Sequence, residues 1–190
     1  VEPDEEDIRA NLLLDKILGA EVHIVDIQPG ESKAEAEERS IRMGREHMAR
    51  LEAEGHKCYE VPIGGASPVG SVGFIEGFTE LMEQAEQMFG KEPDYLFHAT
   101  GSGGTMAGLL AGRALKGAKV PVISINVSLK DDGYPKRCAA LANESLKVLG
   151  IEPMVEQERD VRTDLNYYHP GYEIPSESAS KAIRLLAETE

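Results

Sequence analysis

Residues 95–115 read YLFHATGSGGTMAGLLAGRAL, and this stretch decides the fold. The apolar run 95–99 has the character of a short strand, and the small and apolar residues 106–115 indicate a buried helix. Glycines and hydroxyl residues lie between them, at 100–105. Backbone N–H groups in the first turn of a helix have no partner within the helix, and the helix dipole adds positive charge there. The pattern therefore predicts an anion-binding turn that holds a phosphate group.

Three kinds of phosphate loop could account for this turn. A nucleotide P-loop requires a Lys-Ser/Thr pair after its last glycine, but Thr105 and Met106 follow Gly104. A dinucleotide fingerprint requires Gly or Ala in place of Met106 and an acidic residue at the end of the next strand, which here ends on Asn126. A compact cofactor held by one terminal phosphate remains, and pyridoxal phosphate is the obvious candidate. The alternative is a glycine-rich turn that binds nothing, because isolated motifs of this kind are weak signals.

Composition limits the classes of partner. The 190 residues are 41% hydrophobic, and no apolar run approaches the ~20 residues that span a bilayer. A formal net charge of −14 would repel nucleic acid and anionic lipid, so we expect neither nucleic acid nor a membrane as a partner. Cys58 and Cys138 form no metal or redox motif, which favours the cytoplasm. The five histidines show no ligand spacing, and we predict no metal site.

Strands and helices alternate along the chain. The patterns predict helices over 8–18, 32–54, 71–89, 106–115, 134–149 and from Ser176 onward, and strands over 21–27, 57–63, 95–99, 120–127 and, more weakly, 153–155. This alternation predicts an α/β fold, with a mainly parallel twisted sheet and helices on both faces. Ligands bind at the carboxyl ends of the strands in such sheets. The glycine loops 64–70 and 100–105 both follow predicted strands, so they could face one cleft.

Four motifs together carry a resemblance to a known family. They are NLLLDK at 11–16, VPIGGASPVGSVGF at 61–74, ATGSGGTMAG at 99–108 and PGYEIP at 170–175. In this order and spacing they resemble the 1-aminocyclopropane-1-carboxylate deaminase/D-cysteine desulfhydrase family. That family belongs to the pyridoxal-phosphate enzymes of fold type II, which have the tryptophan synthase β architecture. The likeness extends over essentially all 190 residues.

The resemblance implies a set of site residues. The cofactor phosphate would be held, mostly by backbone N–H groups, by Ala99, Thr100, Gly101, Ser102, Gly103, Gly104 and Thr105. Gly64 and Gly65 would line the cofactor pocket, although two glycines in sequence can also simply form a turn. Tyr172 would lie near cofactor and substrate and act as the catalytic residue, positioning substrate or helping proton transfer. The alternative for Tyr172 is a loop tyrosine that packs on the sheet.

The resemblance also implies how the chain is divided. Residues 1–63 correspond to the C-terminal part of the smaller lobe, and residues 64–190 to most of the larger lobe, which binds the phosphate. The family usually forms homodimers, and we expect one here. Its chemistry requires a lysine that binds the cofactor covalently, which comes from a Gly-Asn-Lys segment. Neither that segment nor the family's Ser-Asn-His segment occurs in this sequence, and we give none of its lysines this role. We therefore expect an internal part of a longer enzyme, inactive by itself.

The implied activity of the parent protein is that of a pyridoxal-phosphate lyase or deaminase acting on a small amino acid. D-cysteine is the example we favour, and it would give pyruvate, sulfide and ammonia. Ala66 and Ser67 stand where many desulfhydrases have Ser-Asn, and Glu173 stands where Gly is usual. These positions lie near the expected substrate end, so the identity of the amino acid stays open. The alternative is a non-catalytic α/β module that binds a phosphate ligand or a partner and lacks the lysine.

Overall fold

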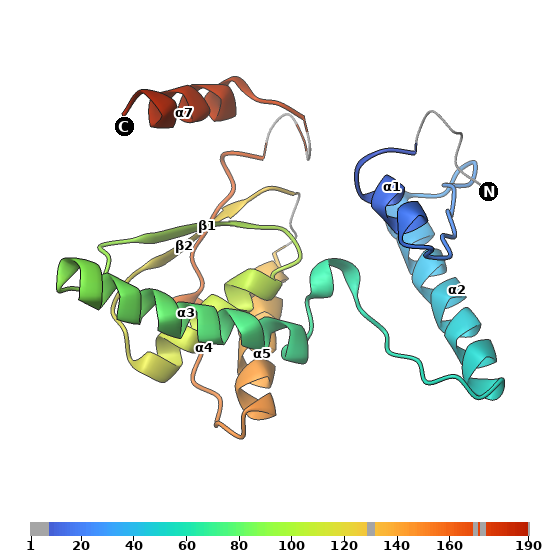
Figure 1. The fold of residues 1–190 in the computed structure, drawn as a ribbon, viewed down its shortest axis with the longest axis horizontal. Coiled ribbons are helices and arrows are strands. Elements are labelled where there is room, and N and C mark those ends of the chain that lie inside the picture. Colours follow the sequence, from blue (N-terminus) through green and yellow to red (C-terminus); the bar gives the residue numbers. More distant parts are fainter. Residues whose placement is uncertain (1–7, 129–131, 169–170, 172–173, 190) are drawn as a thin grey trace. The chain divides into compact units, whose positions relative to one another are not determined.

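The computed structural model describes residues 8–128, 132–168, 171 and 174–189. The chain divides into two compact units, Val1–Glu60 and Val61–Glu190. Figure 1 shows the elements of each unit along the chain. Among the described helices, none combines the length and the apolar composition that a membrane crossing requires.

The first unit contains two helices, α1 (Ala10–Ile17) and α2 (Lys33–Ala53). A capping box starts α2: the Oγ of Ser32 accepts the backbone N–H of Glu35 at 3.3 Å, and the Glu35 carboxylate accepts the Ser32 N–H at 2.8 Å. An ion pair between Arg39 and Glu31, 2.7 Å long, ties the helix to the preceding loop. Both predicted helices of this unit are confirmed.

The strands predicted over 21–27 and 57–63 are wrong. A strand satisfies its backbone N–H and C=O groups on a neighbouring strand. The described part of the first unit has helices as its only regular structure, so these apolar alternating segments have no ladder to join. Residues 63–65 instead form a short 3₁₀ turn, which leads into the second unit's first long helix.

The second unit is built around a three-stranded sheet in which all described strands are parallel. The strands are β1 (Leu96–Thr100), β2 (Val122–Asn126) and β3 (Thr163–Asp164), in the order β1-β2-β3. The register of the first pair runs from Leu96 opposite Val122 to Thr100 opposite Asn126. This confirms the α/β class and the parallel sheet, including the strands predicted over 95–99 and 120–127.

The weak strand predicted over 153–155 is not a strand, and β3 lies further along the chain. The cause is the side chain of Asn143. Its Oδ1 accepts the backbone N–H groups of Met154 and Val155 at 3.0 and 2.9 Å, and its Nδ2 donates to the Val155 carbonyl at 2.9 Å. These backbone groups are therefore satisfied by one amide and not by a ladder.

The helices described in the second unit are α3 (Pro68–Phe89), α4 (Gly104–Lys116), α5 (Tyr134–Val148), α6 (Gln157–Asp160) and α7 (Glu177–Glu188). α3 begins at Pro68 and not near residue 71, because Ser67 caps it by accepting the Gly70 N–H at 3.0 Å and proline suits the first helical position. α7 begins at the predicted place, because Ser176 caps it by accepting the Ala179 N–H at 3.1 Å.

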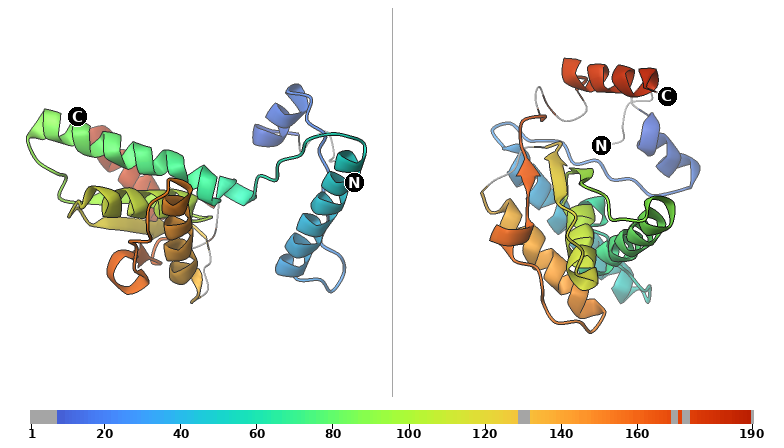
Figure 2. Two further views of the ribbon diagram at one scale, coloured as in Figure 1. Left: turned by 90° about the horizontal axis from the view of Figure 1, so that it is seen from below. Right: turned by 90° about the vertical axis from the view of Figure 1, so that its left-hand side faces the viewer.

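Close packing of α3 against α4 forms the centre of the core (Figures 1 and 2). Gly108 and Gly112 of α4 make this approach possible. A Cβ on Gly108 would lie 2.4 Å from the Ser71 carbonyl oxygen, and one on Gly112 would lie 2.7 Å from the Cβ of Phe78. Phe78 and Leu110 are among the most deeply buried side chains of the cluster, at 0% and 1% exposure. The glycine spacing of α4 therefore fixes how its first turn is placed beside the start of α3.

The two faces of the sheet differ. Alternate residues of β1 and β2, among them Thr100, Ser124 and Asn126, are buried on the helix side. Both crossovers move across the sheet in the same direction, so right-handed connections place α4 and α5 on that one face. On the other face Phe97 is 62% exposed. Helical cover on this second face stays a prediction.

Candidate functional site

The centre of the candidate site is the turn 101–103, which joins the carboxyl end of β1 to the start of α4. Gly103 is the N-cap of α4 and has φ 96° and ψ −7°, a left-handed conformation that favours glycine. No side chain caps this helix. A strand that runs through glycines into an uncapped helix N-terminus is the arrangement expected of an anion site.

Backbone donors at the start of α4 have no hydrogen-bond partner among the described residues. Within the described ranges, the N–H groups of Ser102, Gly103, Gly104 and Thr105 have no hydrogen-bond partner, while the Gly103 carbonyl accepts the Ala107 N–H at 2.9 Å. Gly103 and Gly104 are buried, Thr105 is half-buried and Ser102 is exposed. Unpaired amides cost free energy when buried, so a ligand with several acceptor oxygens would be stabilised here.

The second glycine loop lies against the first. A Cβ on Gly64 would lie 2.5 Å from the Ser102 Oγ, and a Cβ on Gly104 would lie 3.2 Å from the Cα of Ala66. Gly64 and Gly65 have φ of 67° and 63°, so both adopt the left-handed conformation. The structure thus brings together the two loops that the sequence analysis placed at strand ends, although residues 57–63 form no strand. The starts of α3 and α4 meet at this contact.

Two buried polar side chains near the loop have no hydrogen-bond partner among the described residues. Asn126 pairs with Thr100 in the sheet register, is 0% exposed, and has no hydrogen bond at either Oδ1 or Nδ2 among the described residues. The same holds for the Oγ of Ser71, which lies 3.7 Å from the Cβ position of Gly104. An unsatisfied buried polar group costs about 1–3 kcal/mol, so such residues gather at sites with a function. The sequence analysis used Asn126 only to exclude a dinucleotide and did not identify Ser71.

Sequence reasoning also missed the pair His98 and Ser124, which face each other across β1 and β2. The His98 Nδ1 lies 2.9 Å from the Ala99 carbonyl oxygen and must donate to it, which leaves Nε2 to accept from the Ser124 Oγ at 2.6 Å. Burial lowers the pKa of His98, and the hydrogen bond to the Ala99 carbonyl only partly offsets this effect. No sequence signal could reveal the pair, since only the strand register brings the two residues together.

Of the remaining predicted site residues, Thr100 and Ala99 lie in the described part of the chain and Tyr172 does not. Thr100 is buried at the end of β1, and its Oγ1 lies 2.7 Å from the Tyr134 hydroxyl of α5. Ala99 is exposed on the other face of the strand. Tyr172 and Glu173 lie outside the described residues, so their predicted roles stay predictions.

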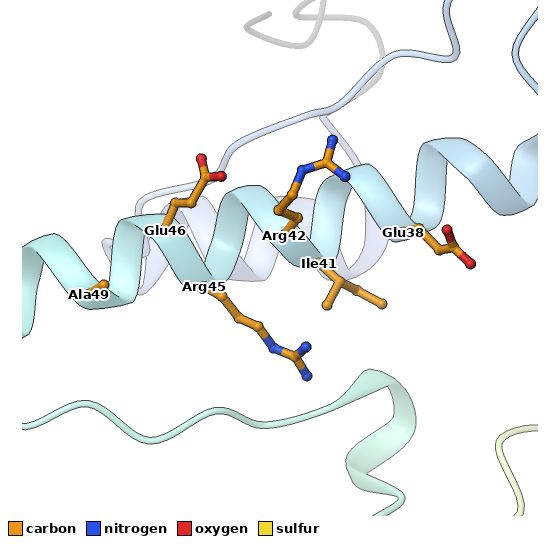
Figure 3. Close-up of a pocket in the computed structure, with 6 residues that line it drawn as sticks. All are labelled: Glu38, Ile41, Arg42, Arg45, Glu46 and Ala49. Atoms are coloured by element: carbon orange, nitrogen blue, oxygen red, sulfur yellow. The ribbon is translucent and has the colours of Figure 1, made fainter.

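Two hollows in the described surface are lined by residues outside the glycine loops. One is lined by six residues of α2, namely Glu38, Ile41, Arg42, Arg45, Glu46 and Ala49. Figure 3 shows Ile41 and Arg45 extending to one side of the helix and Arg42 and Glu46 to the other, and Arg45 pairs with Glu60 at 3.0 Å. The other hollow lies beside β3 and is lined by Ile123 and residues 162–166. Neither contains a residue that the sequence analysis selected.

One group of metal-ligand residues occurs in the first unit. Ligand atoms of Glu21, His23 and His47 lie within 4.8 Å of one another. The guanidinium of Arg50 donates to the His47 Nδ1 at 2.9 Å, and Glu21 accepts from the His23 Nε2 at 2.7 Å. A cation would have to bind next to this guanidinium, which opposes it electrostatically. The arrangement is satisfied as an exposed hydrogen-bonded cluster.

Comparison with protein families gives a match over nearly the whole chain. Residues 3–190 match the family model described as "Pyridoxal-phosphate dependent enzyme". A solved structure, described as a crystal structure analysis of the ACC deaminase homologue, superposes with a TM-score of 0.73 at 28% identity and covers 97% of this chain and 52% of that one. The sheet, helices and glycine turn therefore belong to a fold that occurs in that homologue.

Two curated relatives have a higher sequence identity to this chain than the solved structure has. A candidate 1-aminocyclopropane-1-carboxylate deaminase of Pyrococcus abyssi is 37% identical over 155 residues, which is 82% of this chain and 44% of the relative. A 1-aminocyclopropane-1-carboxylate deaminase of Cyberlindnera saturnus is 31% identical over 185 residues, which is 95% of this chain and 50% of the relative. The chain spans about half the length of the curated relatives it matches.

Proposed function

Because the chain belongs to the family of pyridoxal-phosphate dependent enzymes, we propose that its protein deaminates a small amino acid with this cofactor. The observation that carries the proposal is the turn between β1 and α4, where the N–H groups of residues 102–105 have no partner in the described structure. A phosphate dianion offers the acceptor oxygens that such a turn lacks. Family membership favours an enzyme over a non-catalytic binding module.

The residues present fit the cofactor's phosphate. Amides without a partner in the described structure and a helix N-terminus without a side-chain cap together provide backbone donors for a small anion at the start of α4. We assign residues 99–105 to the phosphate, and Gly64 and Gly65 to the wall beside it. When bound, pyridoxal phosphate supplies an electron-poor ring that stabilises negative charge on a substrate carbon. The chain's own part is to hold that group in place and to limit its movement.

Tyr172 is our proposed catalytic residue, with the role of positioning substrate or moving a proton. Residues 1–63 and 64–190 are our proposed parts of a smaller and a larger lobe. The observed units, Val1–Glu60 and Val61–Glu190, divide the chain three residues before this proposed boundary. A homodimer is proposed as the assembly.

For the substrate we propose D-cysteine. One molecule of D-cysteine and one of water would give pyruvate, hydrogen sulfide and ammonia, so that the C–S bond and the C–N bond break and the carbonyl oxygen comes from water. The names of the similar proteins favour the other candidate, 1-aminocyclopropane-1-carboxylate. Ala66 lies at the contact of the two glycine loops and Ser67 follows it, so a difference in side chain at these positions could select between such substrates.

The test uses the natural full-length protein. Its visible absorbance is recorded while pyridoxal phosphate is added, and it is then assayed with D-cysteine, L-cysteine and 1-aminocyclopropane-1-carboxylate. We expect a saturable absorbance band, and sulfide and pyruvate from D-cysteine. A protein without any band contradicts the enzyme proposal. A band together with ammonia from the cyclopropane substrate alone contradicts only the choice of D-cysteine.

A further inference from the structure

Tyr134, at the start of α5, has a hydroxyl directed at the beginning of the glycine turn. Its side chain is almost fully enclosed, with the residue 4% exposed. The hydroxyl lies 2.7 Å from the Thr100 Oγ1 and donates to the Gly101 carbonyl at 3.3 Å. With one proton on each group, Thr100 can donate to Tyr134 while Tyr134 donates to Gly101, so both hydroxyl protons are used. Burial raises the pKa of Tyr134 far above its ordinary value, which keeps this donor protonated.

The ring of Tyr134 also limits the space beside the turn. A Cβ on Gly103 would lie 3.4 Å from the Tyr134 hydroxyl oxygen and 3.0 Å from the Cys138 Sγ, one turn further along α5. Gly103 holds a left-handed φ of 96°. The start of α5 therefore contacts the turn at Thr100, Gly101 and Gly103, three of the four residues before α4.

The turn needs such support from outside. α4 has no side-chain cap, and the β1–β2 ladder ends just before the turn, where the Thr100 carbonyl accepts the Val127 N–H at 3.1 Å. Several free amides must converge on one anion to bind it well, and small displacements of a loop weaken such a site. The side chain of Tyr134 supplies the contact that neither the helix cap nor the sheet ladder provides.

We propose that Tyr134 is a positioning residue for the phosphate-binding turn, holding Thr100 and Gly101 so that the amides of residues 102–105 converge on the cofactor phosphate. This inference rests on the proposed function. It predicts that the Tyr134 hydroxyl matters for ligands that carry the phosphate and not for ligands that lack it.

The experiment compares pyridoxal phosphate with pyridoxal, which lacks the phosphate, as ligands of the full-length protein. In the variant Tyr134→Phe we expect the dissociation constant for pyridoxal phosphate to rise about tenfold, the effect of losing one buried hydrogen bond, while that for pyridoxal stays within about twofold of the wild type. The matched control is Tyr95→Phe, which removes the same atom from a residue that is 60% exposed. The control should leave both constants unchanged.

A second variant, Thr100→Val, removes the other hydroxyl and should give the same selective loss, so the prediction can be tested even if Tyr134→Phe does not fold. The double variant should bind pyridoxal phosphate no more weakly than Tyr134→Phe, because that single variant already removes both the hydrogen bond with Thr100 and the one to Gly101. Equal losses for both ligands, or no loss, would overturn the positioning role. A wild-type protein that binds neither ligand would overturn the proposed function and this inference with it.

Discussion

Gly64 and Ser102 are in contact, although they belong to different loops of the chain. A Cβ added to Gly64 would lie 2.8 Å from the Ser102 Cβ and 2.5 Å from its Oγ. The hydroxyl could rotate away, but the Cβ can move only with the backbone of the turn. The spacing of the two loops therefore depends on the absence of a side chain at Gly64.

Replacing Gly64 with Ala should weaken the binding of pyridoxal phosphate by about tenfold, because the clash displaces the turn that carries the free amides. Gly90→Ala is the matched control. Both positions have a φ of 67°, so both alanines lose about 1–2 kcal/mol from the left-handed backbone, but a Cβ on Gly90, at the C-terminal end of α3, meets nothing within 4 Å. Equal affinities for the two variants would show that the contact does not set the turn.

Gly108→Ala should lower the free energy of unfolding by about 1–3 kcal/mol, since the new methyl group would lie 2.4 Å from both the Phe74 Cβ and the Ser71 carbonyl oxygen at the α3–α4 interface. Denaturant titration measures the change. Gly73→Ala, inside α3 with open space around its Cβ position, should instead raise the stability by about 0.5–1 kcal/mol. A stabilising Gly108→Ala would contradict the close packing of the two helices.

Stability should fall as the pH drops below about 6.5, in part because of His98. Burial, the largest cause, lowers the pKa of His98 from its ordinary value of 6.5, so the unfolded chain takes up a proton more readily than the folded one. The contribution of His98 is therefore complete above pH 6.5 and is lost as the pH falls toward its lowered pKa. Denaturant titrations at several pH values should show a smaller decline for His98→Gln. An equal loss of stability with falling pH in the wild type and in His98→Gln would mean that His98 is not the group responsible.

Asp160→Ala should lower the free energy of unfolding by about 3 kcal/mol. The Asp160 side chain is 5% exposed, and its carboxylate binds Arg113 at 3.0 Å and Arg159 at 2.7 Å. Its loss leaves the largely buried Arg113 without this partner. Glu177→Ala is the comparison, because Glu177 pairs with Lys181 at 2.7 Å while 82% exposed, and it should change stability by at most about 0.5 kcal/mol. Equal shifts of the denaturant midpoint in the two variants would contradict the expectation that the buried ion pair contributes more to stability than the exposed one.

Part of the fold could be predicted from local patterns alone. The strands β1 and β2 and the starts of α2 and α7 depend on residues close in sequence, and all appear in the structure. Residues 153–155 show where such patterns fail. Their backbone groups are bound by Asn143, a residue outside the segment, so an apolar run with strand character does not become a strand.

The sequence by itself determined that a strand, a glycine turn and a helix follow one another, because these preferences arise from backbone freedom and from apolar spacing within a few residues. Only the tertiary structure decided which groups surround that turn. Gly64, Tyr134 and Asn126 come from separate segments and reach it through the packing of α3 and α5 and through the strand register. Such contacts depend on how distant elements share buried space, which no local pattern encodes.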